Sequence, residues 1–275
     1  MTRMKERFKS RQTMAEKGCH AHDNPVNNLH KTKKQFLYYS YKYKLLVCVV
    51  AKTGASTWKS HLLAMKGISS NGINVHSGYW EKKIKAKSIL GKSGMSSMLP
   101  KASKVLTVRH PLDRLVSAYR DKFNGGKPTS GGLGKARDIS FADFLKQVVI
   151  NHWSGGVNAH WSKMYGTCSP CHISYDYIMK TESYSEDLAY IVKKLGIKEV
   201  DASYRRHGLG KPSTESTLSS DNPPLRASTL HYYKNIHIRV LDNLEKIYHI
   251  DMDMFGFEFP SDMMNAINKY RAKNK

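Results

Sequence analysis

Two short segments of the sequence combine basic and hydroxyl side chains at points where a helix is expected to begin. The first is the run Ala51-Lys52-Thr53-Gly54-Ala55-Ser56-Thr57. The first N–H groups of a helix have no partner within the helix and carry partial positive charge, so they bind anions. Gly54 lets the backbone approach a phosphate closely, and Lys52 adds a mobile positive charge. This turn is a candidate anion site; the alternative is a plain turn that binds nothing, since short motifs also match by chance.

The second segment follows an apolar run and begins with an arginine. It is the run Arg109-His110-Pro111-Leu112-Asp113-Arg114-Leu115-Val116-Ser117. Arg109 stands at the end of an expected strand, and Ser117 lies two turns into the following helix. A guanidinium and a hydroxyl at this separation can hold one phosphate from two directions. The alternative is that Arg109 and Arg114 pair with surface carboxylates.

The elements that position these segments alternate between strand and helix. The continuous apolar runs at 44–51 and 103–109 predict strands buried on both faces, as in a parallel sheet. A third strand is expected at 172–180, and the remaining helices at 57–67, 140–150, 183–196 and 226–248. Ser140 and Ser183 are expected to cap two of these helices, and Gly196 is expected to end the second of the two. This alternation predicts an α/β fold with a parallel sheet. Ligands bind at the carboxyl ends of the strands in such sheets, where both segments lie.

The helix that begins at Pro111 has a clear apolar stripe. Proline suits the first helical position. The stripe follows the helical period and consists of Leu112, Leu115, Val116, Tyr119 and Phe123. Arg114 and Ser117 are therefore expected off the stripe, on the polar side of the helix.

The charge indicates an anionic partner. Lysine and arginine number 45 against 22 aspartate and glutamate residues, a formal net charge of +23. Nucleic acid, an acidic membrane surface and an acidic polysaccharide all fit such an excess, and merely solvated lysines are the alternative. No signature of nucleic-acid binding is present. The longest clean apolar run, Leu45 to Ala51, is far shorter than the roughly 20 residues that span a bilayer, and the basic N-terminus has no signal-peptide core.

Four cysteines allow two disulfides with three possible connectivities: Cys19, Cys48, Cys168 and Cys171. A structural zinc needs four ligands, and no second Cys-x-x-Cys is present, although nearby histidines (His152, His160 or His172) offer the missing ones. We expect structural disulfides formed in an oxidising compartment.

Three blocks of sequence resemble the Golgi carbohydrate sulfotransferases. The pattern Lys52-x-Gly54-x-Ser56-x-Trp58-Lys59 is similar to their 5′-phosphosulfate-binding loop, and VRHPLDRLVSAYRDKF to their 3′-phosphate-binding element. The third block, typical of the chondroitin, dermatan and HNK-1 subfamily, comprises 158–161, 168–171 and 175–182, with 248–251 and 255–257 also matching. The resemblance covers about 42 to 257.

The resemblance implies a P-loop-like three-layer fold with a central parallel sheet, of the sulfotransferase type. It implies transfer of a sulfuryl group from 3′-phosphoadenylyl sulfate to a glycan hydroxyl, with no metal required. Residues 51–57 would bind the 5′-phosphosulfate and 109–117 the 3′-phosphate. Lys52 would act as the catalytic cation on the bridging oxygen. His160, in the third block, is the expected general base; a packed histidine is the alternative.

The resemblance also implies a location and an acceptor. We expect a basic N-terminal arm at 1–40, the sulfotransferase domain at 41–260 and a basic tail at 261–275, on the lumenal side of the Golgi membrane. Membrane contact is expected only through an anchor that this sequence does not contain. The expected partner is an acidic, chondroitin- or dermatan-like glycan rather than nucleic acid. The first alternative is a non-enzymatic binder of heparin-like or nucleic-acid polymers. The second is a nucleotide kinase, although this sequence lacks the phosphate-loop motif of such kinases.

Overall fold

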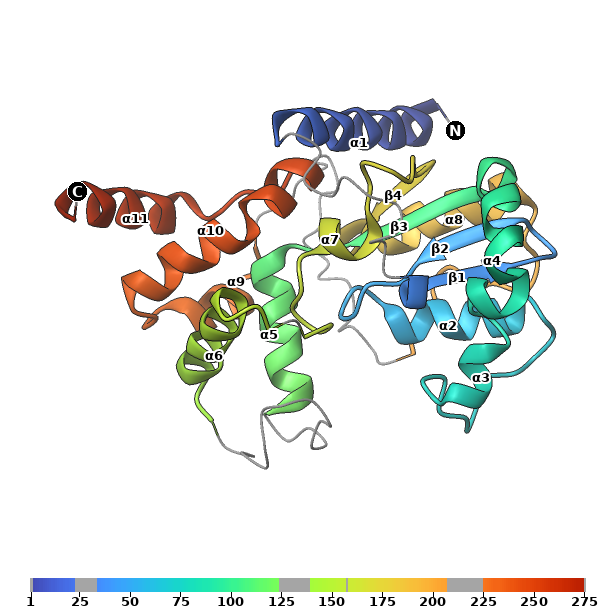
Figure 1. Cartoon of the computed structure of the whole chain (residues 1–275), viewed down its shortest axis with the longest axis horizontal. Coiled ribbons are helices and arrows are strands. Elements are labelled where there is room, and N and C mark those ends of the chain that lie inside the picture. Colours follow the sequence, from blue (N-terminus) through green and yellow to red (C-terminus); the bar gives the residue numbers. More distant parts are fainter. Residues whose placement is uncertain (1, 23–33, 124–138, 157, 207–224, 275) are drawn as a thin grey trace. The chain divides into compact units, whose positions relative to one another are not determined.

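A four-stranded sheet organises the first of the two units into which the chain divides (Figure 1). The computed structural model describes residues 2–22, 34–123, 139–156, 158–206 and 225–274. This sheet unit comprises Met1–Val108 and Met164–Asp221. Its strands are β1 (Leu37–Ser40), β2 (Leu45–Cys48), β3 (Ser103–Val108) and β4 (Tyr177–Lys180), in that spatial order. β2, β3 and β4 run parallel and β1 pairs antiparallel with β2.

The buried parallel strands confirm the predicted α/β class. Every residue of β2 is buried, as a continuous apolar run requires in a sheet covered on both faces. The predicted strand at 172–180 is shorter in the structure, because Asp176 uses its side chain instead of its backbone to pair with β3. Its carboxylate accepts a hydrogen bond from the Lys104 N–H at 2.7 Å. β1 was not predicted; its four residues fall inside the expected polar arm.

Helices flank this sheet. They are α1 (Thr2–Ala21), α2 (Ala55–Ala64), α3 (Gly78–Lys82), α4 (Ala86–Met98), α7 (Met164–Cys168) and α8 (Tyr184–Leu195), with 3₁₀ turns at Lys34–Phe36, Leu99–Lys101 and Thr181–Ser183. The sequence predicted α2 and α8, and α8 ends at a left-handed Gly196 as expected. The predicted cap by Ser183 is wrong, because its hydroxyl donates to the Asp187 carboxylate at 2.8 Å. The sequence does not predict α3 and α4, because the stretch 68–103 is rich in lysine, serine and glycine and has little helical periodicity.

The N-terminal segment forms a helix that packs against β4. Phe8 is buried edge-on against Tyr177, with ring centroids 5.2 Å apart. Arg11 is also buried, and it donates to the Asp187 carboxylate at 2.7 Å and to the Ile178 carbonyl at 2.9 Å. The expected weakly periodic arm therefore begins with an ordered helix. The division of the chain at residues 40 and 260 stays a prediction, and 23–33 lie outside the described residues.

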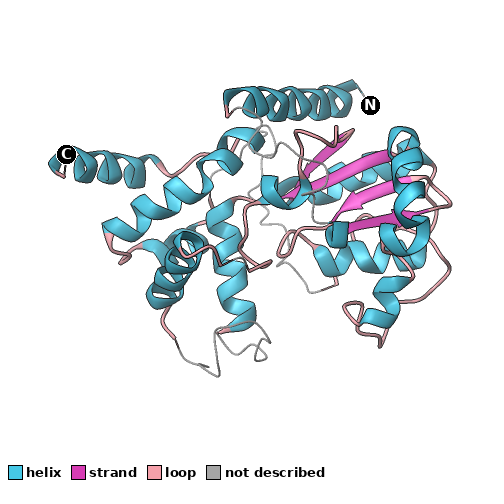
Figure 2. Cartoon of the chain, in the orientation of Figure 1, coloured by secondary structure: helices cyan, strands magenta, loops and turns pink. Residues whose placement is uncertain are grey.

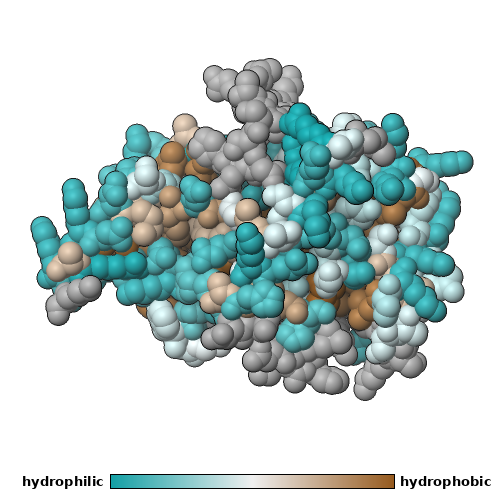
Figure 3. All heavy atoms as spheres, turned by 90° about the horizontal axis from the view of Figure 1, so that it is seen from above, coloured by the Kyte–Doolittle hydropathy of each residue, from teal (hydrophilic) through white to brown (hydrophobic). Residues whose placement is uncertain are grey.

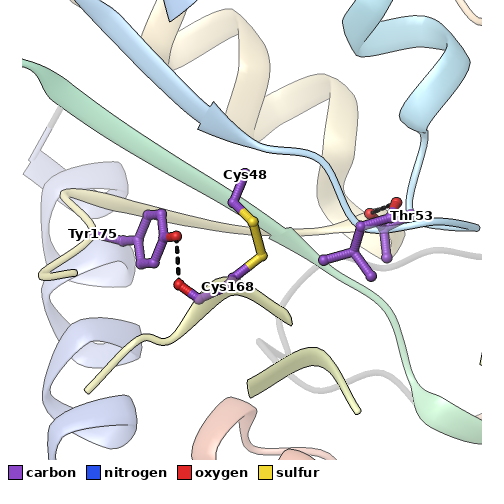
Figure 4. The surroundings of a disulfide bond; sticks show 5 residues. Cys48, Thr53, Cys168 and Tyr175 are labelled. Carbon is purple, nitrogen blue, oxygen red and sulfur yellow. Dashed lines mark hydrogen bonds between the residues drawn. A yellow bond between two sulfur atoms is a disulfide. The ribbon is translucent and has the colours of Figure 1, made fainter. Parts of the chain in front are cut away.

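Two disulfides hold the sheet unit together. Cys48 of β2 is bonded to Cys168 of α7, and Cys19 of α1 is bonded to Cys171. The Tyr175 hydroxyl donates to the Cys168 carbonyl at 2.8 Å beside the first bond (Figure 4). All four sulfurs are thus oxidised, as expected, and none is left as a thiolate for the alternative zinc site.

The second, helical unit comprises Arg109–Lys163 and Asn222–Lys275. Its helices are α5 (Pro111–Lys122), α6 (Phe141–Trp153), α9 (Ala227–Tyr233), α10 (Ile238–Phe255) and α11 (Ser261–Lys273), shown in cyan in Figure 2. Ser140 caps α6 as predicted, accepting from the Asp143 N–H at 3.1 Å. The single helix expected at 226–248 is two helices, since His237 accepts from the Arg239 N–H and starts α10 anew. None of the helices described in either unit is long and apolar enough to cross a membrane.

Candidate functional site

The turn between β2 and α2 has an unusual backbone. The N–H and the hydroxyl of Thr53 both donate to the Val50 carbonyl, at 3.4 and 2.9 Å. Lys52 and Gly54 have φ angles of 69° and 90°, in the left-handed region. Left-handed residues in a turn direct successive N–H groups into one concavity that suits an anion. A non-glycine residue keeps this costly conformation only where its surroundings impose it, which is typical of ligand sites.

Glycine is required at position 54 for two reasons. Its φ disfavours any side chain, and a Cβ atom there would lie 3.2 Å from Cε2 of Tyr184. Gly54 is also the N-cap of α2, and no side chain caps this helix. The first N–H groups of α2 therefore have neither an intrahelical acceptor nor a side-chain cap. These N–H groups lie at the end of α2 that directly follows the left-handed turn.

The rest of α2 is anchored in the core of the sheet unit. Trp58 is 1% exposed and donates from Nε1 to the Thr107 hydroxyl of β3 at 2.8 Å. Thr57 is buried, and its hydroxyl accepts from the Arg206 N–H at 3.2 Å. Ser56 is half-buried and contacts His76, as described below. The predicted residues from Ala51 to Thr57 are thus gathered in one rigidly supported turn.

The second predicted segment begins with a preorganised arginine in the helical unit. Arg109 is buried and donates from Nε and Nη2 to one Asp113 carboxylate oxygen, each at 2.7 Å. The Thr229 hydroxyl donates to the other oxygen. Burial by itself raises the pKa of Asp113, but the charge of Arg109 and the Thr229 hydrogen bond outweigh it and lower that pKa. The carboxylate therefore stays charged and fixes the guanidinium.

The next residues build the start of α5. His110 is its N-cap, and Nδ1 accepts from the Leu112 N–H at 3.2 Å. Nδ1 is therefore unprotonated, so Nε2 carries the proton and donates to the Glu258 carbonyl at 2.9 Å. Pro111 occupies the first turn as predicted. The expected core positions Leu115 and Val116 are buried, and Ser117 is half-buried.

Arg114 departs from the prediction. It is 1% exposed instead of lying on a polar face, and burial lowers its pKa. Its guanidinium donates to the carbonyl groups of Ser162 and Ala159. The pattern of apolar residues misses this placement because it counts an arginine as a surface residue. Arg114 thus holds the backbone on both sides of His160.

His160 has a defined tautomer. The Asn158 side-chain oxygen accepts from the His160 backbone N–H and lies 2.9 Å from Nδ1. Since that oxygen only accepts, Nδ1 carries the proton and Nε2 carries the lone pair. This is the form that a general base needs.

The structure adds residues that sequence reasoning missed. Tyr184 packs against Gly54, and Arg206 holds Thr57; a third, His76, contacts Ser56. No periodicity marks them, because each lies far along the chain from the residue it supports. The parallel register, in which Cys48 is paired with Leu106, does bring the ends of β2 and β3 to one edge of the sheet, as predicted.

Comparison with known proteins gives a consistent result. A profile described as the sulfotransferase family matches residues 34–258. Carbohydrate sulfotransferase 9 from Homo sapiens is 27% identical over 244 residues, covering 82% of this chain and 53% of that relative. Carbohydrate sulfotransferase 11 from Rattus norvegicus is 26% identical over 244 residues, covering 80% of this chain and 66% of the relative. Carbohydrate sulfotransferase 8 from Mus musculus is 25% identical over 239 residues, covering 80% and 55%.

The chain therefore spans between about half and two thirds of the length of these relatives. No solved structure matches it significantly.

Proposed function

Since the chain belongs to the sulfotransferase family, we propose that it transfers the sulfuryl group of 3′-phosphoadenylyl sulfate to a hydroxyl of a glycan. The observation that carries this proposal is the β2–α2 turn. Left-handed Lys52 and Gly54 precede an uncapped helix there, which suits a phosphosulfate group. The similarity to carbohydrate sulfotransferases supports a sugar acceptor.

Lys52 is the proposed catalytic cation. Sulfuryl transfer is an in-line displacement, in which positioning and stabilisation of charge on the leaving oxygen lower the barrier. The other residues of the 51–57 turn would bind through their N–H groups and the hydroxyl groups of Ser56 and Thr57. The buried support of this turn by Trp58 keeps those donors in place.

Arg109 and Ser117 are the proposed ligands of the 3′-phosphate, at the start of the 109–117 segment and two turns into α5. The pairing with Asp113 supports this role, because it fixes the guanidinium before any ligand arrives. A preorganised donor loses little conformational freedom on binding. Arg114 is proposed to act within the same segment by holding the His160 loop, not by direct phosphate contact.

His160 is the proposed general base. The Asn158 side chain holds its ring in the tautomer that leaves Nε2 able to accept the proton of the acceptor hydroxyl. The transfer then forms an oxygen–sulfur bond to the glycan and breaks the bond between sulfur and the bridging oxygen.

An acidic glycan of the chondroitin or dermatan type is the proposed acceptor. The net charge of +23 favours a polyanion. Hydrophilic residues cover much of the face drawn in Figure 3, and a band of hydrophobic residues lies on its left side. On α3, Tyr79 is 65% exposed and the Lys83 ammonium lies 4.9 Å from its ring centroid, a combination suited to a charged sugar. The two disulfides favour an oxidising compartment, and we propose the Golgi lumen.

Two measurements test the proposal. First, 3′,5′-bisphosphoadenosine is expected to raise the melting temperature whereas ATP is not, because ligand binding to the folded state stabilises it. Second, labelled sulfate is expected to transfer from 3′-phosphoadenylyl sulfate to one or more members of a panel of desulfated glycosaminoglycans. Binding of the glycans without transfer, and without a response to the bisphosphate, would instead establish the alternative of a non-enzymatic polyanion binder.

A further inference from the structure

Four side chains of the sheet unit form a continuous hydrogen-bonded chain that ends at the anion-binding turn. The Ser56 hydroxyl lies 2.8 Å from Nε2 of His76. Nδ1 of the same ring lies 2.8 Å from the Lys59 ammonium, which in turn contacts the Glu81 carboxylate. The chain therefore runs from Glu81 through Lys59 and His76 to Ser56.

The direction of the hydrogen bonds follows from the chemistry of lysine. An ammonium group has donors and no acceptor, so Nδ1 of His76 accepts from Lys59. The proton of the neutral ring is then on Nε2, which donates to the Ser56 oxygen. With its oxygen already accepting from His76, the Ser56 hydroxyl directs its own proton elsewhere. Ser56 lies in the first turn of α2, next to the left-handed turn proposed to hold the anion.

Glu81, at the far end of this hydrogen-bonded series, holds Lys59 in place and favours its charged form. Lys59 is 5% exposed, and burial lowers its pKa while Glu81 opposes that shift. Glu81 also accepts from the Tyr38 hydroxyl at 3.1 Å and pairs with Lys85 at 2.7 Å. Burial alone raises the pKa of Glu81, but these lysine contacts lower it overall. A buried ammonium with a charged partner on one side can serve as a fixed donor to His76 on the other.

We propose that His76 is a positioning residue, which orients the Ser56 hydroxyl as a donor to the 5′-phosphosulfate of the sulfuryl donor. This inference rests on the proposed function, since it assigns a role within the same turn. Lys59 and Glu81 act one step behind, by fixing the tautomer of His76. His76 lies in the stretch 68–103, where the sequence has little periodicity and carries none of the motifs described above.

The test is a double-mutant cycle between Ser56→Ala and His76→Ala, read as affinity for 3′,5′-bisphosphoadenosine by calorimetry. Each single variant is expected to bind roughly tenfold more weakly, the loss of about one hydrogen bond to a charged group. The double variant is expected to bind no more weakly than Ser56→Ala alone, because His76 acts through Ser56. His76→Gln, whose amide N–H can donate to Ser56, is expected to restore most of the affinity.

Adenosine 3′-monophosphate supplies a second readout, since it lacks the 5′-phosphate. Its affinity is expected to be the same for the unmodified protein and for His76→Ala, and His231→Ala, at an exposed position of α9, is the matched control. Additive losses in the cycle, an unchanged bisphosphate affinity in His76→Ala, or an equal loss for both nucleotides would each overturn the role of His76. A wild-type protein that binds no bisphosphate would instead overturn the proposed function itself.

Discussion

At the scale of single residues, the charge of Lys52 matters most at one moment of the proposed reaction. Negative charge on the bridging oxygen grows only as the sulfuryl group departs. Lys52→Ala is therefore expected to lower kcat by roughly 10²–10³ while changing cofactor affinity far less. Steady-state kinetics at saturating acceptor, with a separate binding titration, measure the two effects.

The control for this variant is Lys193→Ala, which removes the same charge from an exposed position of α8. Normal turnover by Lys52→Ala at saturation, with tenfold weaker cofactor binding, would show that Lys52 is a binding residue only.

Arg109 and Ser117 are expected to act on affinity instead. Arg109→Ala and Ser117→Ala should each weaken the binding of 3′,5′-bisphosphoadenosine by roughly 1.5–3 kcal/mol, the value of a hydrogen bond to a charged group. Arg109→Ala also leaves the buried Asp113 carboxylate without its cation, so its melting temperature must be measured alongside. If both variants bind the bisphosphate as tightly as the unmodified protein, the 3′-phosphate lies elsewhere.

At the scale of elements, α2 contains a buried histidine, His61, that makes the stability of the protein depend on pH. His61 is 3% exposed, its Nε2 has no partner among the described residues, and it packs against Trp58 and Tyr204. Burial, with a smaller contribution from the charge of Arg205, lowers the pKa of His61 to about 4. The unfolded chain, with a histidine pKa of about 6.5, binds the proton more readily between these values.

The free energy of unfolding is therefore expected to fall as the pH drops from about 6.5 towards 4, by about 2–3 kcal/mol from this residue. Replacing His61 with phenylalanine should flatten that part of the pH profile, measured by urea unfolding at a series of pH values. His231→Phe, at an exposed site, should leave the profile as it was. An equally steep profile for His61→Phe would show that the dependence has another origin.

α5 is joined to the His160 loop through Arg114. Arg114→Ala removes the donors for the Ser162 and Ala159 carbonyl groups and is expected to destabilise the protein by roughly 2–4 kcal/mol, since a buried polar group without a partner costs about 1–3 kcal/mol. Arg120→Ala, at an exposed position of the same helix, should cost less than about 0.5 kcal/mol. Denaturant unfolding compares the two; equal losses would argue against the buried role of Arg114.

The elements that the sequence predicted are those whose cause is local. The strands β2 and β3 follow from apolar runs, and the starts of α2 and α5 from glycine and proline beside them. α1 was missed because its partners, Asp187 and Cys171, lie more than a hundred residues away in sequence. The contact of Ser56 with His76 depends likewise on how a loop without a motif folds back over α2.

At the scale of the whole molecule, composition indicates some properties, whereas others depend on contacts between residues that are distant in the sequence. The net charge of +23 indicated a polyanion, and the four cysteines indicated two disulfides. Their connectivity was not predictable, because it depends on the packing of α1 and α7 against the sheet and not on the Cys-x-x-Cys spacing. The two neighbouring cysteines bond to different partners, one on β2 and one on α1.

Removing either disulfide is expected to lower the stability of the sheet unit, but only one of the two removals is expected to weaken ligand binding as well. The two disulfides close sequence separations of 120 and 152 residues, and removal of a native disulfide typically costs about 2–5 kcal/mol. Cys48→Ser with Cys168→Ser removes the bond between β2 and α7, at the end of β2 that leads into the anion-binding turn. This variant is therefore expected to lose both stability and affinity for 3′,5′-bisphosphoadenosine.

Cys19→Ser with Cys171→Ser removes the covalent link of α1 only, and the ion pair of Arg11 with Asp187 still holds that helix. This second variant should lose stability while keeping most of its affinity for the bisphosphate. Thermal unfolding and calorimetry on both variants measure the contrast, and intact mass under non-reducing conditions confirms two bonds in the parent protein. One zinc ion per chain in metal analysis, or free thiols in the folded parent, would contradict the connectivity from which this contrast follows.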